Sequence, residues 1–147
     1  MAKINAWLLT ANQVRLTVAS YEIIQVISEA KIIDVPAGPN YCRQLLKWRE
    51  YLLPLVQLGK IEQADSENQP HIIVVAWQKK AGEMLAYGAI ALSELPTSIV
   101  VDDSWQVDLP QNLSPILKKS ALSCIQYQDE NVIIPDLKIM FGVESHG

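Results

Sequence analysis

The chain has 147 residues, of which 50% are hydrophobic and 19% are charged, so it can bury the core of one domain, and disorder is excluded for most of it. Its 12 basic and 16 acidic residues give a net charge of -4. That is the wrong sign for a surface that binds nucleic acid or anionic lipid. Composition therefore favours protein partners.

Few side chains are available for chemistry. Cys42 and Cys124 are far apart in the sequence, which excludes a zinc knuckle and a CxxC redox pair. His71 and His146 are too few for a metal cluster, and the sparse glycines form no nucleotide-binding motif. We therefore expect no enzymatic activity, no metal and no other cofactor.

The sequence contains no obvious membrane segment. Its longest unbroken apolar run, Ile72 to Trp77, is far shorter than the roughly 20 residues that cross a bilayer. The apolar part of the first ten residues is too short for a signal peptide and has no cleavage site. We expect a cytoplasmic protein with reduced thiols and no direct membrane insertion.

The first two elements differ in periodicity. Apolar and polar side chains alternate from Val14 to Val18, which predicts a half-buried strand. Ser20 is then positioned to cap one or two helical turns, with the isoleucines between Ile23 and Ile27 on one side. This region is therefore predicted to pass from a strand into a short helix.

Most later elements are predicted to be strands. β-Branched residues form short runs bounded by proline, asparagine or aspartate, which is typical of strands. These runs are 32–33, 72–75, 99–101 and 132–134. Further short helical turns are predicted at Ser93 to Leu95 and Pro115 to Lys119, and no helical period extends beyond about 12 residues. The fold class is therefore mainly β and barrel-like.

A polar segment from Glu62 to Pro70 divides the chain nearly in half and predicts an exposed loop. Each half then contains a similar apolar phrase with a proline, from Leu52 to Leu58 and from Val132 to Leu137. This weak repeat suggests two related sheets or lobes, although strand chemistry alone also produces such phrases. Pro54 and Pro135 predict an edge strand or a bulge, because proline cannot donate a hydrogen bond to a sheet.

The four tryptophans are expected to pack mainly in the core. Trp7, Trp77 and Trp105 lie inside or beside apolar strand patterns. Trp48 alternates with charged neighbours, so we favour a core position over a partner anchor.

The stretch from Val35 to Leu58 is the most informative. It contains a Val-Pro pair, a second proline and an aromatic residue, then apolar residues, a Trp-Arg pair and an apolar strand. The residues are Val35, Pro36, Pro39, Tyr41, Leu45, Leu46, Trp48, Arg49, Leu52, Leu53, Pro54, Leu55, Val56 and Leu58. This order resembles the central signature of CheW-like domains. The Trp-Arg form is similar to divergent members that serve type IV pilus (twitching) chemosensory systems.

The resemblance covers nearly the whole chain. Val14 to Ile27 is similar to the first hairpin of the family, while Gly88 onward and Ile134 to Phe141 are similar to its second-lobe strands. It implies a single CheW-like domain over 1–147, with a polar loop near 62–70. The implied fold is mainly β, with two SH3-like five-stranded β-barrel lobes packed together and short helical turns.

The resemblance also implies a function without catalysis. CheW-like proteins are adaptors that couple the cytoplasmic tip of a chemoreceptor to the regulatory domain of a CheA-type histidine kinase. Two alternatives stay open: a degenerate CheW-like module that competes for the kinase, and a small β-barrel that binds single-stranded nucleic acid, which the negative net charge disfavours.

Arg49 is the first candidate for a partner contact. Its guanidinium can bind a partner carboxylate in bidentate geometry, and arginine is enriched at interface hot spots. The alternative is a solvated turn arginine paired with Glu50 or Glu22. Arg43, Lys47 and Arg49 form a basic stripe that could meet an acidic helical hairpin, or serve only solubility. The full set of expected partner-binding residues is Val26, Arg43, Gln44, Lys47, Trp48, Arg49 and Glu50.

Several positions depart from the family pattern. Gln44 and Glu50 stand where glycine is usual, and Lys47 stands where asparagine is common. Gln25 replaces a glutamate, and Gln57 replaces an aspartate. Since glycine adopts positive φ freely, Glu50 predicts a strain of roughly 1 kcal/mol or a turn of another shape.

Overall fold

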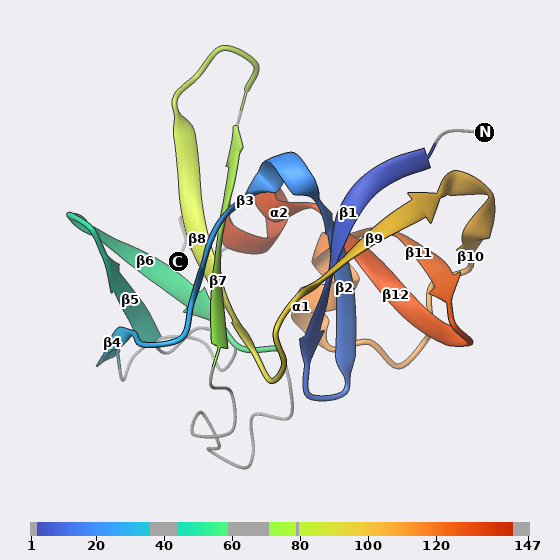
Figure 1. Ribbon diagram of the computed structural model, residues 1–147, viewed down its shortest axis with the longest axis horizontal. Coiled ribbons are helices and arrows are strands. Elements are labelled where there is room, and N and C mark those ends of the chain that lie inside the picture. Colours follow the sequence, from blue (N-terminus) through green and yellow to red (C-terminus); the bar gives the residue numbers. More distant parts are fainter. Residues whose placement is uncertain (1–2, 36–43, 59–70, 79, 143–147) are drawn as a thin grey trace.

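A computed structural model describes residues 3–35, 44–58, 71–78 and 80–142. These residues form two curled six-stranded sheets with two short helices, as Figure 1 shows. The prediction of a mainly β, two-lobed fold is confirmed. Each sheet contains six strands where five were expected.

We call the first sheet the terminal lobe, because it contains the first and last strands of the chain. Its strand order is β10-β11-β12-β2-β1-β9. The bounds are β1 (Lys3–Ala11), β2 (Val14–Ala19), β9 (Thr97–Asp102), β10 (Gln106–Val107), β11 (Ala121–Tyr127) and β12 (Glu130–Pro135). Neighbouring strands are antiparallel except β12 and β2, which are parallel.

The second sheet, which we call the central lobe, has the order β3-β7-β8-β6-β5-β4. The bounds are β3 (Ile23–Ile27), β4 (Lys31–Asp34), β5 (Gln44–Trp48), β6 (Tyr51–Val56), β7 (His71–Gln78) and β8 (Leu85–Leu92). Here the parallel pair is β6 and β8. The remaining pairs are antiparallel.

Each half of the chain contributes strands to both lobes. The N-terminal half places β1 and β2 in the terminal lobe and β3 to β6 in the central lobe. The C-terminal half places β7 and β8 in the central lobe and β9 to β12 in the terminal lobe. The two strand orders match when β1 to β6 are aligned with β7 to β12.

This alignment explains the repeated apolar phrase. Most of the phrase from Leu52 to Leu58 lies on β6, and most of the phrase from Val132 to Leu137 lies on β12. Both strands make the parallel pairing of their sheet. The interpretation as two related sheets is therefore supported. The predicted polar loop from Glu62 to Pro70 lies outside the described residues; in the sequence it falls between the two repeats and not between the two lobes.

The short elements correct several predictions. Ser20 begins a single 3-10 turn, η1 (Ser20–Glu22), but Ile23 to Ile27 form strand β3 and no helix. Ser93 to Leu95 contain no helical turn. The predicted turn near Pro115 is helix α1 (Pro115–Ser120), whereas the strand expected to end at Phe141 stops at Pro135 and is followed by helix α2 (Leu137–Gly142). Another 3-10 turn, η4 (Asp103–Trp105), precedes β10.

One buried cluster joins the two lobes. It combines side chains from both sheets with side chains from α1 and α2, which lie at the junction of the lobes (Figure 1). Its members are Leu9, Ala11, Leu16, Val18, Val56, Leu58, Ile73, Val75, Ile90, Leu92, Ile116, Leu117, Cys124, Ile133, Leu137, Met140 and Phe141. Burying this apolar surface is the main favourable term that holds the lobes together.

Three of the four tryptophans pack as predicted. Trp7 and Trp77 lie against the shared core, and Trp48 lies in the separate core of the central lobe. Trp105 is 38% exposed, so its predicted core position is wrong. It sits on η4, where its ring contacts Tyr127 at 6.1 Å between ring centroids and leaves one side open.

Candidate functional site

Arg49 and Glu50 form the two-residue turn between β5 and β6. Trp48 and Tyr51 face each other across the ends of the two strands. Arg49 has φ of +54°, while Glu50 is not among the described residues with positive φ. The left-handed position is therefore Arg49 and not Glu50. Positive φ at the first loop residue alone is the pattern of a type II′ hairpin turn, where glycine is usual.

Trp48 fixes the place of the arginine. The indole is 4% exposed, and the guanidinium carbon of Arg49 lies 4.2 Å from its ring centroid. Such a contact between a cation and an aromatic face stabilises by about 0.5–1 kcal/mol at exposed sites. The guanidinium is therefore held against a buried ring at an exposed turn.

Two tyrosines complete an aromatic group with Trp48. Tyr51 stacks on Trp48 with centroids 6.1 Å apart, and Tyr87 of β8 lies 5.3 Å from Trp48 and 5.8 Å from Tyr51. Tyr51 is 51% exposed. We call Trp48, Arg49, Tyr51 and Tyr87 the aromatic–arginine cluster.

A hydrogen bond closes the curl of the central lobe at this cluster. The indole N–H of Trp48 donates to the side-chain oxygen of Gln25, at 3.0 Å. Gln25 lies on β3 and Trp48 on β5, which are not neighbours in the sheet. The bond therefore brings Val26, the next residue on the edge strand β3, to the same end of the lobe. Val26 is exposed.

Lys47 points to the other face of β5. It is exposed and lies directly opposite Lys31 on β4 and Leu52 on β6. Side chains directly opposite on neighbouring strands share a face, so two lysines and an exposed leucine lie together there. The structure thus separates Lys47 from the aromatic group on the opposite face of the same strand.

Two departures from the family pattern contact each other. The side-chain amide of Gln57 donates to the side-chain oxygen of Gln44, at 2.5 Å. Gln44 in turn donates to the carboxylate of Asp34, at 2.9 Å. Gln44 is therefore the middle residue of a row of three hydrogen-bonded side chains, and both its amide nitrogen and its amide oxygen already have partners within the protein.

The ion pairs of Arg49 with Glu50 or Glu22, which are the alternative to a partner contact, are not formed among the described residues. Among the described residues, one ion pair is present, between Arg15 and Glu130 at 2.6 Å. Arg49 and Glu50 are both exposed, and Glu22 lies elsewhere, at η1. Arg43 lies outside the described residues, so the basic stripe is described only at Lys47 and Arg49.

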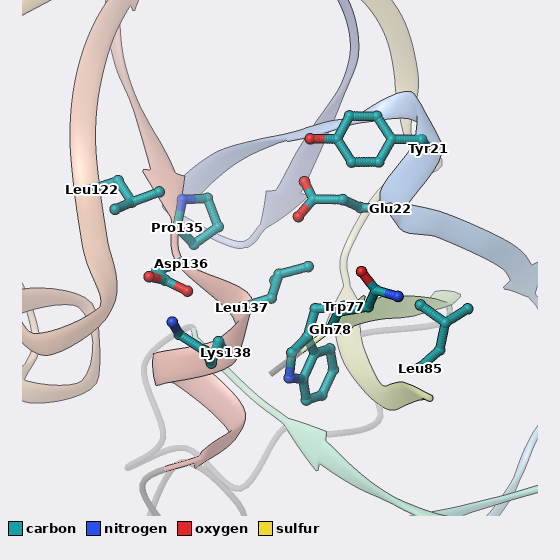
Figure 2. A pocket seen from close by; sticks show the side chains of 10 residues that line it. All are labelled: Tyr21, Glu22, Trp77, Gln78, Leu85, Leu122, Pro135, Asp136, Leu137 and Lys138. Carbon is teal, nitrogen blue, oxygen red and sulfur yellow. The ribbon is translucent and has the colours of Figure 1, made fainter. Parts of the chain in front are cut away.

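A pocket of about 340 Å³ lies where the lobes meet (Figure 2). Its walls come from η1, from β7 and β8 of the central lobe, and from β11, β12 and α2 beside the terminal lobe. The lining residues are Tyr21, Glu22, Trp77, Gln78, Leu85, Leu122, Pro135, Asp136, Leu137 and Lys138. Figure 2 shows Glu22 on one side and Asp136 with Lys138 on the other.

Burial is the main reason that the pKa of Glu22 is raised. The backbone N–H of Ala19 lowers this pKa, and the charge of Asp136 raises it. That N–H donates to the Glu22 carboxylate at 3.0 Å. Glu22 is thus a half-buried acid at the link between the lobes.

Sequence reasoning missed part of this arrangement. The position of Tyr51 follows from pairing β5 and β6 around a two-residue turn, so a register argument could have found it. Tyr87 and the pocket residues come together only through the packing of distant strands, and no local signal marks them.

The described residues contain neither a candidate metal site nor a candidate membrane-spanning helix. They contain no group of three or more histidine, cysteine, aspartate or glutamate side chains that could hold a metal ion. In this part of the chain, no helix is long and apolar enough to span a membrane.

No protein-family model matches the sequence, and no curated protein matches it either. A solved structure does match: the scaffolding protein TtCheW from Thermoanaerobacter tengcongensis, with a TM-score of 0.68. The similarity covers 97% of this chain and 94% of that chain, at 14% sequence identity. At this identity the comparison establishes the fold, and the chain has the two-lobed fold of CheW scaffold proteins.

Proposed function

We propose that this protein is a non-enzymatic adaptor of a chemotaxis-type signalling system. It couples the cytoplasmic tip of a chemoreceptor to the regulatory domain of a CheA-type histidine kinase, in the cytoplasm, and the Trp-Arg motif favours a type IV pilus (twitching) system. Two lines support the proposal: the CheW-like fold over almost the whole chain and the family motif from Val35 to Leu58.

The observation that carries the proposal is the state of Arg49. Arg49 is exposed, its guanidinium lies over the Trp48 ring, and it has no carboxylate partner among the described residues. A cation held in one position loses less side-chain entropy when it binds, so it is suited to a partner carboxylate. Exposed Tyr51 and Val26 add apolar area at the same end of the lobe.

The remaining expected contacts divide by face. Trp48 and Glu50 belong to the Arg49 end, whereas Lys47 belongs to the opposite face with Lys31 and Leu52. We propose that these two faces meet different partner surfaces. Gln44 contributes by holding the strand end through its side-chain hydrogen bonds. Arg43 is proposed from the motif alone.

The test is a titration of the purified chain with the isolated regulatory domain of a CheA-type kinase from the same cell, and then with a receptor-tip fragment. We expect micromolar affinity, as for interfaces of about 800 Å² per partner or less. Arg49→Glu should weaken binding of the receptor tip at least about tenfold while the circular dichroism spectrum stays unchanged. Lys119→Glu is the matched control, because it makes the same charge change at an exposed position of α1.

The outcomes separate the proposals. Equal weakening by Arg49→Glu and Lys119→Glu would contradict the role of Arg49. Binding of the kinase domain without any binding of the receptor tip would favour the competitor module. Binding of neither partner would overturn the adaptor function.

A further inference from the structure

The pocket between the lobes carries two carboxylates from different parts of the chain. Glu22 belongs to η1, which links β2 of the terminal lobe to β3 of the central lobe. Asp136 lies between β12 and α2, and its carboxylate accepts from the backbone N–H of Ile139 at 3.4 Å. Both carboxylates line the same pocket, from opposite sides of it (Figure 2), and the charge of Asp136 contributes to raising the pKa of Glu22.

The pocket does not neutralise these charges itself. Lys138 is the one basic residue in its lining, and it forms no ion pair within the described residues. One lysine facing two carboxylates leaves a net negative charge in a partly desolvated space. Such a charge is costly unless an opposite charge approaches.

The rest of the lining is largely apolar. Leu85 and Leu122 are 47% and 62% exposed and lie at the pocket, where Pro135 and Leu137 also contribute. An aliphatic stem would therefore contact carbon atoms while a charged head reaches the carboxylates. Lysine and arginine side chains have this division between an apolar stem and a charged head.

We propose that this pocket receives one arginine side chain of a partner protein. The guanidinium offers five N–H donors in a planar fork, so it can bind Glu22 and Asp136 at the same time, which a lysine ammonium does less well. The volume of about 340 Å³ lies near the lower end of small-ligand pockets and suits a side chain better than a larger ligand. The inference rests on the proposed adaptor function and names the chemistry of one partner contact.

The test uses the full-length chain labelled with 15N and two small probes. N-acetyl-L-arginine methylamide carries the guanidinium, and N-acetyl-L-citrulline methylamide is its neutral isostere. We expect the arginine probe to shift the backbone amides of Glu22 and Asp136 and the indole N–H of Trp77, with a Kd on the order of millimolar. The citrulline probe should leave these signals unchanged.

Variants connect the effect to the two acids. Glu22→Gln and Asp136→Asn each keep an acceptor oxygen for the internal hydrogen bonds. Each substitution should weaken the binding of the arginine probe about fivefold. Lys138→Gln removes the cation that competes for the two carboxylates, so it should tighten the binding of the arginine probe about twofold. Glu94→Gln, at an exposed carboxylate outside the pocket lining, is the control and should change nothing.

Equal shifts from both probes, or an equal loss in Glu94→Gln, would overturn the arginine site, as would the absence of shifts at the pocket. Such a failure is distinguishable from failure of the adaptor function, which is measured separately with the kinase domain and the receptor tip. If those partners bind and the arginine probe causes no shift of the pocket signals, only the proposal of an arginine site is contradicted.

Discussion

Arg49 combines backbone strain with a favourable side-chain contact. A non-glycine residue at positive φ costs roughly 1–2 kcal/mol, and the stacking on Trp48 offsets about 0.5–1 kcal/mol of this. The sequence predicted strain in this turn but placed it at Glu50, because the motif has glycine there. The glycine-like conformation is one residue earlier, so the position of a glycine in a motif did not locate the strained residue in this chain.

Substitution of Glu50 distinguishes these two views of the turn. Glu50→Gly should lower the free energy of unfolding by about 0.4–1 kcal/mol, because glycine adds freedom to the unfolded chain and relieves no strain at this position. Arg49→Gly should be more stable than Glu50→Gly, because it removes the strained conformation. Urea denaturation of both variants checks the order. A Glu50→Gly protein more stable than the wild type would place the left-handed residue at Glu50.

Glu22 makes stability depend on pH in a defined direction. Its pKa is raised in the folded state from the usual value of 4.5, mainly by burial, so the folded protein binds more protons than the unfolded chain above that pH. Stability contributed by the protonated form is therefore lost as the pH rises through the folded pKa. Glu22→Gln removes this loss and keeps the acceptor for the Ala19 N–H.

We therefore expect Glu22→Gln to raise the melting temperature near pH 7 and to have little effect near pH 4. Thermal unfolding followed by circular dichroism at several pH values measures the difference. The same shift at both pH values would show that the charge of Glu22 is not responsible.

At the scale of elements, α2 shows how packing determines structure that local patterns do not. The segment has only six residues, and such a short helix is not stable by propensity alone. It forms against the shared core through Leu137, Met140 and Phe141. Phe141 stacks on Trp77 with centroids 4.8 Å apart, which attaches the helix to β7 of the central lobe.

Gly88 on β8 provides the space for this helix. A Cβ atom at this position would lie 2.5–2.7 Å from three ring atoms of Phe141, which is too close for van der Waals contact. Gly88→Ala should therefore displace Phe141 and destabilise the protein by about 1–3 kcal/mol. Gly142→Ala, where a Cβ meets nothing within 4 Å, is the control and should change stability much less.

The second substitution Phe141→Leu tests the cause. It should recover part of the loss when combined with Gly88→Ala, because the smaller side chain leaves room for the methyl group. Additive losses in the double variant would contradict a direct clash. Urea denaturation of the single and double variants gives the required coupling energy.

Local patterns predicted some elements and missed others for identifiable reasons. The alternation from Val14 to Val18 and the proline that begins α1 are local signals, and both agree with the element that forms. The isoleucines of β3 fit a helical spacing and a strand equally, and pairing with β7 decided for the strand. Asp136 lies directly before α2 and is a typical helix N-cap residue. This signal could have ended the predicted strand at Pro135 and not at Phe141.

The candidate site was predictable to a similar degree. The motif marked Trp48 and Arg49, and the structure places them in direct contact. It could not show that Lys47 lies on the opposite face with Lys31, since that depends on the register of β4 against β5. The pocket acids are separated by more than a hundred residues and meet only in the folded chain.

At the scale of the whole molecule, the exchange of strands between repeats makes the two lobes interdependent. Each repeat contributes two strands to one sheet and four to the other. Neither half of the chain contains a complete sheet, and the shared core requires side chains from both. We therefore propose that residues 1–147 form one domain that unfolds in a single cooperative transition.

Cutting the chain between the repeats tests this dependence. The polar segment 62–70 separates β6 from β7, so fragments 1–66 and 67–147 each hold one repeat of six strands. Alone, each fragment would leave the apolar faces of its strands without the partner strands that cover them, and we expect both to be largely unfolded. Mixed in equal amounts, they should regain a β-type circular dichroism spectrum and elute together at the size of the intact chain. A stable fold in either isolated fragment would show that a repeat, and not the strand-exchanged whole, is the cooperative unit, because the missing strands would then be dispensable.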